Sequence, residues 1–291
     1  MSGSGAARDA GAGGGASEAA AVAPEQRRIL AMGGGGFTME PNNPLLDDFV
    51  LSLARAPRPR ILFLPTAAGD TTGQINAFYA RFAGRGCVPE HLSLFRLADV
   101  ERPLAEIVAE QDIVYAGGGS MRNLLAIWRA HELDTMLIEA WRRGTVLAGL
   151  SAGAMCWFEG GVTRSSGPPA PIAGLGLLPG SLTVHADGEP ERLPVWLQSV
   201  RSGALPGGWA LDDGVGALFA GERLERIVSS RPGAGAQRVD AIAGELVRGR
   251  LEPELLGAPP RGPATSFDED IQELRHVHRM RARVSREERP R

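Results

Sequence analysis

Short apolar runs alternate along the first half of the chain with longer segments whose apolar positions have helical spacing. The apolar runs predict strands at 27–32, 59–67, 91–97, 112–119 and 145–150. The amphipathic segments predict helices at 45–56, 76–86, 101–111, 121–128 and 134–143. Strands separated by helices favour a parallel sheet that is covered by helices on both faces. We therefore expect a three-layer, doubly wound α/β fold with a mainly parallel sheet.

The pattern changes after residue 150. A Gly/Pro-rich stretch at 160–180 is followed by shorter apolar runs with turns between them, at 208–213, 215–222, 223–230 and 236–242. These runs predict short strands and a small antiparallel part at one edge of the sheet. Residues 26–256 are expected to form a single domain, because about 235 residues suffice for one large core. A Gly/Ala-rich segment, 1–25, and a charged segment, 257–291, are predicted to be tails.

Composition excludes several classes of protein. The 291 residues carry a net charge of -3, and all 31 basic residues are Arg, so neither a Schiff-base lysine nor a phosphate-loop lysine exists. No basic face is indicated that would bind nucleic acid. The two Cys residues have no metal or disulfide spacing, and no apolar run is long enough to span a bilayer. We expect a cytoplasmic protein, and a homo-oligomer is left open.

Ser151 lies at the centre of the most specific motif, Gly149-Leu150-Ser151-Ala152-Gly153, between an apolar strand and a helix-like segment. A nucleophile at such a sharp turn needs small neighbours, because the backbone is strained and the helix passes close to the strand. The N–H groups at the start of the helix would face an oxyanion formed beside Ser151. The motif indicates a nucleophile elbow, whereas the alternative is a simple connecting turn.

A glycine run, Ala116-Gly117-Gly118-Gly119-Ser120, follows the preceding strand of the predicted sheet. Loops at the carboxyl ends of neighbouring strands meet in one crevice, so the N–H groups of this run are placed to complete an oxyanion hole and to bind substrate. The run lacks the lysine and the full glycine pattern of a nucleotide-binding loop.

His185 is the best placed of the five histidines to act as the general base, because it begins a polar turn directly after an apolar strand. His91 and His131 fit structural or exposed positions better. His276 and His278 belong to the charged C-terminal segment, and their spacing would divide a metal pair between two faces of a helix.

Several segments in order resemble the peptidase E family of aspartyl dipeptidases, which is related to cyanophycinase. They are GGGGFTMEPNNPLLDDF, YAGGGSMRNLLAIW, AGLSAGAMCWFE, LGLLPGS before His185, the DDG turn and IVSSRPGA. The resemblance covers residues 27–251 and implies a sheet topology like that of class I glutamine amidotransferases. It implies Ser151 as the nucleophile, His185 as the base, and Gly118 with Ala152 as the oxyanion donors. It also implies cleavage after an N-terminal Asp without metal or cofactor.

The third member of the triad is open, because Arg164 stands where many members of the family carry an Asp. An acid is needed to orient the imidazole. We favour Asp212, whose LDDG turn resembles the position of the acid in cyanophycinase-like relatives, and place Glu159 second. The other nearby acids are Asp187 and Asp213.

Recognition of an acidic side chain requires an arginine in a chain without lysine. Arg192 is the candidate, because members of the family carry an Arg in the same downstream turn; a surface role for Arg192, or recognition by Arg164, is the alternative. Gly117, Gly119 and Ser120 are expected to complete the substrate site.

The sequence thus predicts a serine exopeptidase that acts on short peptides, with dipeptides that begin with Asp preferred. Two alternatives stay open. One is a non-catalytic binding protein with a degenerate triad, and the other is an α/β-hydrolase-type esterase that takes its His from residue 276 or 278. A glutaminase has little support, because Ser151 stands where a Cys is required.

Overall fold

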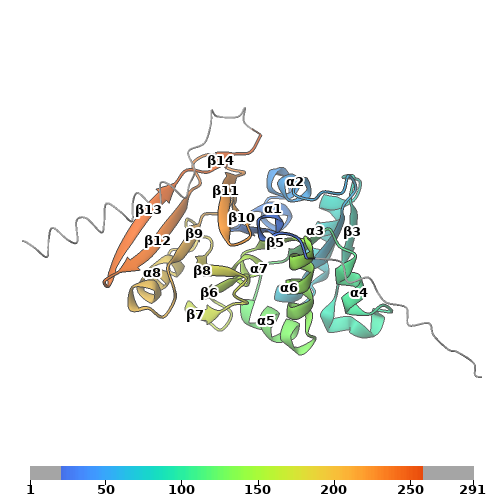
Figure 1. Ribbon diagram of the computed structural model, residues 1–291, viewed down its shortest axis with the longest axis horizontal. Helices are drawn as coiled ribbons and strands as arrows, with labels where there is room; N and C mark the ends of the chain where they lie inside the picture. The colour runs from blue at the N-terminus through green and yellow to red at the C-terminus, as the bar shows by residue number, and fades with distance from the viewer. Residues whose placement is uncertain (1–20, 258–291) are drawn as a thin grey trace, which may run out of the picture.

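Two β-sheets and the helices around them make up residues 21–257, the part of the chain that a computed structural model describes (Figure 1). The predicted C-terminal segment, apart from Gly257, and residues 1–20 lie outside this range. Residues 21–25 belong to the predicted N-terminal tail, but they pack against the domain. Val22 N donates to Arg142 O at 2.9 Å, and a 3-10 helix, η1, follows at Pro24–Gln26. None of the helices in 21–257 combines the length and the hydropathy that crossing a membrane requires.

The first sheet has eight strands in the order β14-β11-β10-β1-β5-β4-β2-β3. Five neighbouring strands, from β1 to β3 in that order, are parallel, and β10 and β11 extend the sheet by antiparallel pairing. The strands are β1 (Arg28–Met32), β2 (Arg60–Leu64), β3 (Val88–His91), β4 (Ile113–Ala116), β5 (Val146–Leu150), β10 (Val215–Ala220), β11 (Arg223–Ser229) and β14 (Glu254–Leu255).

Helices cover both faces of this sheet. One face packs its Leu, Ile and Val side chains against α4 (Leu104–Ala109), α5 (Met121–Ala130), α6 (Leu133–Arg143) and α7 (Ala152–Met155). The other face packs against α1 (Gly36–Met39), α2 (Leu45–Ser52) and α3 (Thr72–Phe82), where Phe37, Phe63 and Phe78 meet with ring centroids 5.0–5.8 Å apart. The strands between these layers are buried on both sides, which explains their continuous apolar sequence. The predicted three-layer α/β fold is confirmed.

The second sheet was not expected as a separate layer. It has six strands in the order β13-β12-β9-β8-β6-β7 and lies beside the first sheet (Figure 1). The strands are β6 (Phe158–Thr163), β7 (Ala170–Ala173), β8 (Leu178–Thr183), β9 (Gly208–Leu211), β12 (Ala236–Ile242) and β13 (Glu245–Leu251). Helix α8 (Arg192–Ser202), also unpredicted, packs Trp196 into a core shared with Val162 and Val239. The predicted antiparallel segments divide between the sheets, because β10 and β11 join the first and β9 and β12 the second.

One predicted strand, 91–97, is misplaced. The chain forms β3 at Val88–His91 and then a 3-10 segment, η3 (Leu94–Asp99), which is kinked at Arg96. The buried side chains of Leu92 and Leu94 produce the alternation that resembled a strand. The turn is held by Asp70, whose Oδ2 accepts a hydrogen bond from Phe95 N at 3.0 Å.

Candidate active site

Ser151 forms a sharp turn between the last residue of β5 and the first residue of α7. Its φ of 54° and ψ of -112° lie in a region that non-glycine residues rarely adopt. The neighbouring glycines leave no room for a side chain: a Cβ at Gly149 would lie 1.9 Å from Gly153 O, and one at Gly153 would lie 2.2 Å from Ala116 O. Ser151 N donates to Met32 O at 3.1 Å, which ties the turn to β1. The predicted sequence of strand, sharp turn and helix is therefore present, although α7 has only four residues.

His185 lies against Ser151 and against an acid. It follows β8 with a φ of 53°, and its backbone N–H donates to Gly33 O at 3.2 Å. His185 Nε2 is 2.9 Å from Ser151 Oγ, and His185 Nδ1 is 2.5 Å from Asp213 Oδ1. The side chains of His185 and Asp213 are only 12% and 14% exposed. Three segments far apart in the sequence thus assemble a Ser-His-Asp arrangement.

Asp212, the acid favoured from the sequence, does not contact His185. Its Oδ2 accepts a hydrogen bond from Gly235 N at 2.8 Å, its backbone N–H donates to Gly235 O at 3.1 Å, and burial raises the pKa of its carboxyl. Successive side chains at the end of a strand point to opposite sides, so Asp213 takes the position beside the imidazole. The prediction of Asp212 as the orienting acid is therefore corrected to Asp213.

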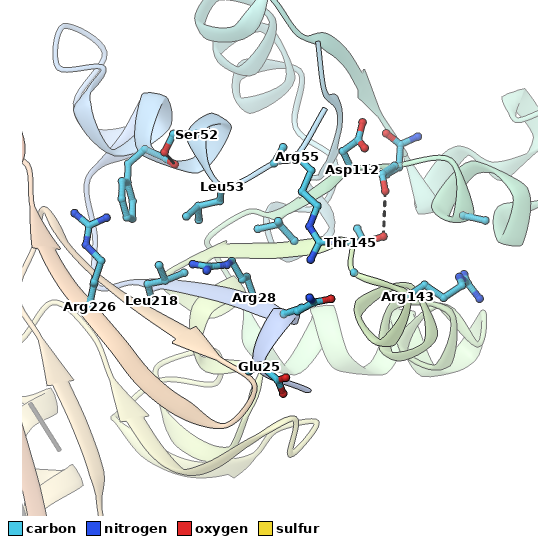
Figure 2. Close-up of a pocket in the computed structure, with 17 residues that line it drawn as sticks. Glu25, Arg28, Ser52, Leu53, Arg55, Asp112, Arg143, Thr145, Leu218 and Arg226 are labelled. Carbon is cyan, nitrogen blue, oxygen red and sulfur yellow. Dashed lines mark hydrogen bonds between the residues drawn. The ribbon is translucent and has the colours of Figure 1, made fainter. Parts of the chain in front are cut away.

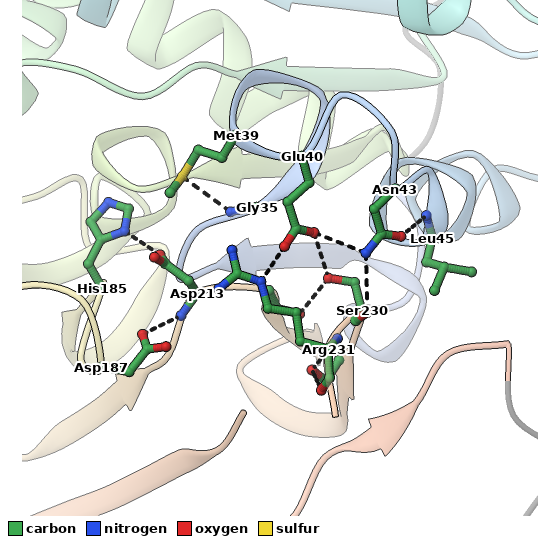
Figure 3. Close-up of polar contacts among 12 residues, drawn as sticks. Gly35, Met39, Glu40, Asn43, Leu45, His185, Asp187, Asp213, Ser230 and Arg231 are labelled. Atoms are coloured by element: carbon green, nitrogen blue, oxygen red, sulfur yellow. Dashed lines mark hydrogen bonds and ion pairs between the residues drawn. The ribbon is translucent and has the colours of Figure 1, made fainter. Parts of the chain in front are cut away.

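The two other acids that the sequence offered also lie elsewhere. Asp187 Oδ1 accepts a hydrogen bond from Asp213 N at 2.8 Å, so Asp187 holds the backbone of the acid that contacts His185 (Figure 3). Glu159 is exposed on β6. Neither side chain makes a hydrogen bond to His185 within residues 21–257.

A second polar cluster holds the loop that carries Asp213. Arg231 Nε forms an ion pair with Glu40 Oε1, and Ser230 Oγ donates to Glu40 Oε2 at 3.0 Å (Figure 3). Asn43 Nδ2 donates to Glu40 Oε2 and to Ser230 O, each at 3.2 Å. The hydrogen bond to Glu40 raises the pKa of the Arg231 guanidinium, and the charge of Asp213 adds to this effect. Sequence reasoning missed this cluster, because a lone Glu after a glycine run carries no recognisable signal.

The glycine run lies beside Ser151, as predicted. A Cβ at Gly118 would lie 3.4 Å from Ser151 Cβ, so this backbone runs past the serine. Gly117 N donates to Leu64 O at 3.0 Å and Ser120 N donates to Ala67 O at 2.7 Å, and both are therefore occupied. Within the described residues, the N–H groups of Gly118 and Ala152 donate to no backbone carbonyl. Backbone donors without a backbone acceptor thus lie beside the serine, both in the glycine run and at the start of α7.

A cavity of about 250 Å³ borders the elbow and the glycine run. Its lining comprises Gly119, Ser120, Met155, Thr163, Arg164, Ser165 and Arg192. Ser120 Oγ caps α5 by accepting a hydrogen bond from Asn123 N at 3.2 Å. The cavity is next to Ser151, because Gly119 follows Gly118 and Met155 N donates to Ser151 O at 2.9 Å.

Arg192 lies at the first position of α8 and not in a turn, and its side chain is buried. Glu189 occupies its guanidinium fork, accepting from Nε at 3.0 Å and from Nη2 at 3.1 Å. Burial lowers the pKa of this guanidinium. Arg164 is 47% exposed, and its Nη1 and Nη2 lie 3.7 Å from Glu189 and Glu191. Arg164 is therefore the freer of the two cations in the cavity.

Within residues 21–257, the side chains of His91, His131 and Cys156 make no hydrogen bond to Ser151 Oγ. His91 Nδ1 is 2.8 Å from Tyr79 Oη, and His131 caps the end of α5. Cys156 is fully buried, its Sγ donates to Gly153 O at 3.2 Å, and burial raises the pKa of its thiol well above the ordinary value. This thiol cannot serve as the nucleophile of a glutaminase. His276 and His278 lie outside the described residues.

The chain is similar to known peptidases. The model of a family described as peptidase family S51 matches residues 29–227. The chain is 46% identical over 223 residues to an uncharacterized peptidase, YgaJ, of Bacillus subtilis (strain 168), a match that covers 77% of this chain and 96% of that protein. The crystal structure of a peptidase from an acI-B1 Actinobacterium superposes with a TM-score of 0.60 and 19% identity, covering 82% of this chain and 96% of that one. The structural likeness supports the fold alone.

Proposed function

Because the chain belongs to peptidase family S51, we propose that it is a serine-type exopeptidase that hydrolyses short peptides, preferentially dipeptides that begin with Asp. Membership confirms the family resemblance drawn from the sequence motifs and makes the chain a peptidase. The observation that carries the serine mechanism is the continuous chain of contacts from Ser151 Oγ through the His185 imidazole to Asp213.

In the proposed mechanism, His185 Nε2 takes the hydroxyl proton of Ser151 while Oγ attacks the scissile carbonyl carbon. Asp213 accepts the hydrogen bond from Nδ1–H, which fixes the tautomer that leaves Nε2 free to accept a proton. His185 then gives this proton to the leaving amine, and the Asp residue of the substrate remains as an ester on Ser151. Water, deprotonated by His185, hydrolyses that ester and restores the hydroxyl.

The oxyanion of the tetrahedral intermediate is stabilised in this proposal by the backbone N–H groups of Gly118 and Ala152. Both flank Ser151, and neither is occupied by a backbone acceptor within residues 21–257. Loss of one oxyanion donor costs about 10²- to 10³-fold in kcat in enzymes of this kind. Gly117 is not such a donor, because its N–H is bonded to Leu64 O.

The preference for an acidic side chain rests on the cavity beside the elbow. Arg164 and Arg192 both line it, and only Arg192 has its fork engaged by a carboxylate at hydrogen-bond distance. We assign direct contact with the substrate carboxylate to Arg164. Buried Arg192 is paired with half-buried Glu189 beside it. Gly119 and Ser120 form the wall of the cavity next to the glycine run.

The test is release of amino acid from Asp-Leu, Glu-Leu and Ala-Leu by the parent protein and by Ser151→Ala. We expect Asp-Leu to be the best substrate and the substitution to reduce kcat by about 10³-fold or more. A Ser151→Ala protein as fast as the parent contradicts the serine mechanism. Failure of the parent on every peptide supports a non-catalytic binding protein.

The acidic preference has its own test. Arg164→Gln should raise KM for Asp-Leu about tenfold and leave Ala-Leu unchanged, because it removes one charge-assisted hydrogen bond. Arg201→Gln is the matched control, since Arg201 is an exposed arginine in the last turn of α8. An equal rise in KM for Asp-Leu and for Ala-Leu contradicts the assignment of Arg164.

A further inference from the structure

A larger cavity, of about 810 Å³, lies at the end of the first sheet away from Ser151. Arg28 begins β1, Val146 begins β5 and Asp112 directly precedes β4, and all three residues line this cavity. Ser151 and the glycine run follow the carboxyl ends of β5 and β4. Because these strands are parallel, the cavity and the active site lie at opposite ends of the same strands.

Arginine dominates the charge of the cavity. Its charged lining residues are Glu25, Arg28, Arg55, Asp112, Arg143 and Arg226. Figure 2 shows the guanidinium groups of Arg28 and Arg55 reaching into the space between α2 and the start of β1. A carboxylate of the lining is already engaged, because Asp112 Oδ2 accepts a hydrogen bond from Arg60 N at 2.8 Å. The cavity therefore offers more cationic than anionic groups to a ligand.

The four arginines differ in how far neighbouring acids neutralise them. Arg28 and Arg226 each have a carboxylate at 2.7 Å, on Glu225 and Glu254, and these pairs leave other guanidinium N–H groups unused. Arg143 has only a distant partner, Glu139, at 3.8 Å. Arg55 is exposed and has no ion pair or hydrogen bond within residues 21–257. An exposed arginine on a cavity wall with no carboxylate beside it is available to bind an anion.

The rest of the lining suits an organic molecule. Leu53 and Ala54 are half-buried and supply apolar surface, whereas Phe49 and Leu218 are buried and the Arg226 guanidinium lies 5.1 Å from the centroid of the Phe49 ring. Cavities of about 300–1,000 Å³ with apolar walls and a few convergent polar groups are the usual form of small-molecule sites. The size of this cavity agrees with that form, and polar residues make up most of its lining.

We propose that this cavity binds a small organic polyanion that carries phosphate or carboxylate groups. Arg55 and Arg28 bind the charged groups through their planar forks, and Leu53 and Ala54 contact the body of the ligand. The site is separate from the catalytic residues and does not depend on the peptidase mechanism.

Calorimetric titration of the full chain at low salt with pyrophosphate, citrate and ADP tests the proposal. We expect saturable binding of one equivalent of at least one probe, and Arg55→Gln should weaken it about tenfold, which corresponds to the loss of one charge-assisted hydrogen bond. Preference for citrate identifies carboxylate as the recognised group, whereas preference for pyrophosphate or ADP identifies phosphate. Tighter binding of ADP than of pyrophosphate supports the contribution of Leu53 and Ala54.

Two arginine variants separate this site from other binding. Arg58→Gln is the matched control, because Arg58 is an exposed arginine three residues from Arg55 that does not line the cavity. Arg164→Gln removes the freest cation of the catalytic cavity. The proposal is overturned if no probe binds saturably, if Arg58→Gln weakens binding as much as Arg55→Gln, or if Arg164→Gln weakens it while Arg55→Gln does not.

Discussion

Gly34 and Asp213 lie so close that a Cβ at Gly34 would be 1.8 Å from Asp213 Oδ1 and 3.0 Å from His185 Nδ1. The first glycine run, at the end of β1, therefore makes room for the acid beside the imidazole. Gly34→Ala should displace the Asp213 carboxylate and reduce kcat/KM for Asp-Leu about 10²-fold or more, as expected when the base loses its orienting group. Peptide hydrolysis and circular dichroism, measured together, distinguish a displaced acid from an unfolded chain.

Gly73→Ala is the control for this substitution. Gly73 lies within α3, and a Cβ there would meet nothing within 4 Å. Alanine should stabilise the helix by up to about 1 kcal/mol and leave activity unchanged. Equal activity of Gly34→Ala and Gly73→Ala would show that hydrolysis does not require the Asp213 carboxylate at its position beside Gly34.

Asp213 and Asp212 are adjacent acids with different contacts, and they should respond differently to the same substitution. Asp213→Asn should reduce kcat about 10³- to 10⁴-fold, because an amide favours the wrong tautomer of the imidazole. Asp212→Asn should keep most of the activity and cost about 1 kcal/mol of unfolding free energy through its weakened contact with Gly235 N. Steady-state kinetics and urea unfolding of both variants check the pair, and the reverse order of losses would restore Asp212 as the orienting acid.

Asp47 is a buried acid away from the active site that should make stability depend on pH. Burial outweighs the charge of Arg81, whose Nε lies 3.0 Å from Asp47 Oδ2, and raises the pKa of Asp47 to about 7. The unfolded value is about 3.9. At a pH between these two pKa values, the Asp47 carboxyl is protonated in the folded state and ionised in the unfolded state. The free energy of unfolding therefore falls as pH rises from about 4 to 7.

Urea unfolding of the parent and of Asp47→Asn across this range measures the effect. The unfolding free energy of the parent, relative to that of the variant, should fall with rising pH and become constant above about pH 7. Asp48→Asn is the control, because Asp48 is a neighbouring acid that is 46% exposed and paired with Arg85. A parent-to-variant difference that stays constant from pH 4 to 7 would mean that Asp47 is ionised throughout.

A chain that ends at Gly257 should keep the activity of the full chain. All three residues of the proposed triad lie before this point, and Leu256 N donates to Ser229 O at 2.8 Å, which fastens the last described segment to β11. Kinetics of the shortened chain on Asp-Leu check this expectation. Complete loss of activity in a folded protein would favour the esterase alternative, in which His276 or His278 supplies the base.

The parallel half of the fold could be predicted from the sequence because each strand there is buried on both faces and each helix on one. These two patterns are the most distinct that a chain can carry. The second sheet was missed because β6, β7 and β8 lie in a stretch rich in Gly and Pro, where Gly160, Gly161 and Gly180 permit close approach of neighbouring backbones. Such positions look like turns in a sequence, although here they are strands.

The site shows a similar division. The contact between Ser151 and His185 could be predicted because each lies at a change from apolar strand to polar turn. The choice between Asp212 and Asp213 depends on which of two successive side chains turns towards the imidazole, and a shift of one residue reverses it. The resemblance of the LDDG turn located the correct turn but not the correct residue within it. Arg192 was found, but its burial against Glu189 depends on α8, which the sequence did not reveal.

The two sheets each contribute part of the proposed triad. Ser151 follows β5 of the eight-stranded sheet, whereas His185 and Asp213 follow β8 and β9 of the six-stranded sheet. A relative displacement of the sheets by about 1 Å would separate Ser151 Oγ from His185 Nε2 and lower the rate about 10²-fold, although every strand would still be paired. On heating, the rate of peptide hydrolysis should therefore decline before the far-ultraviolet circular dichroism changes. The rate of turnover thus reports the relative position of the two sheets more sensitively than secondary structure does.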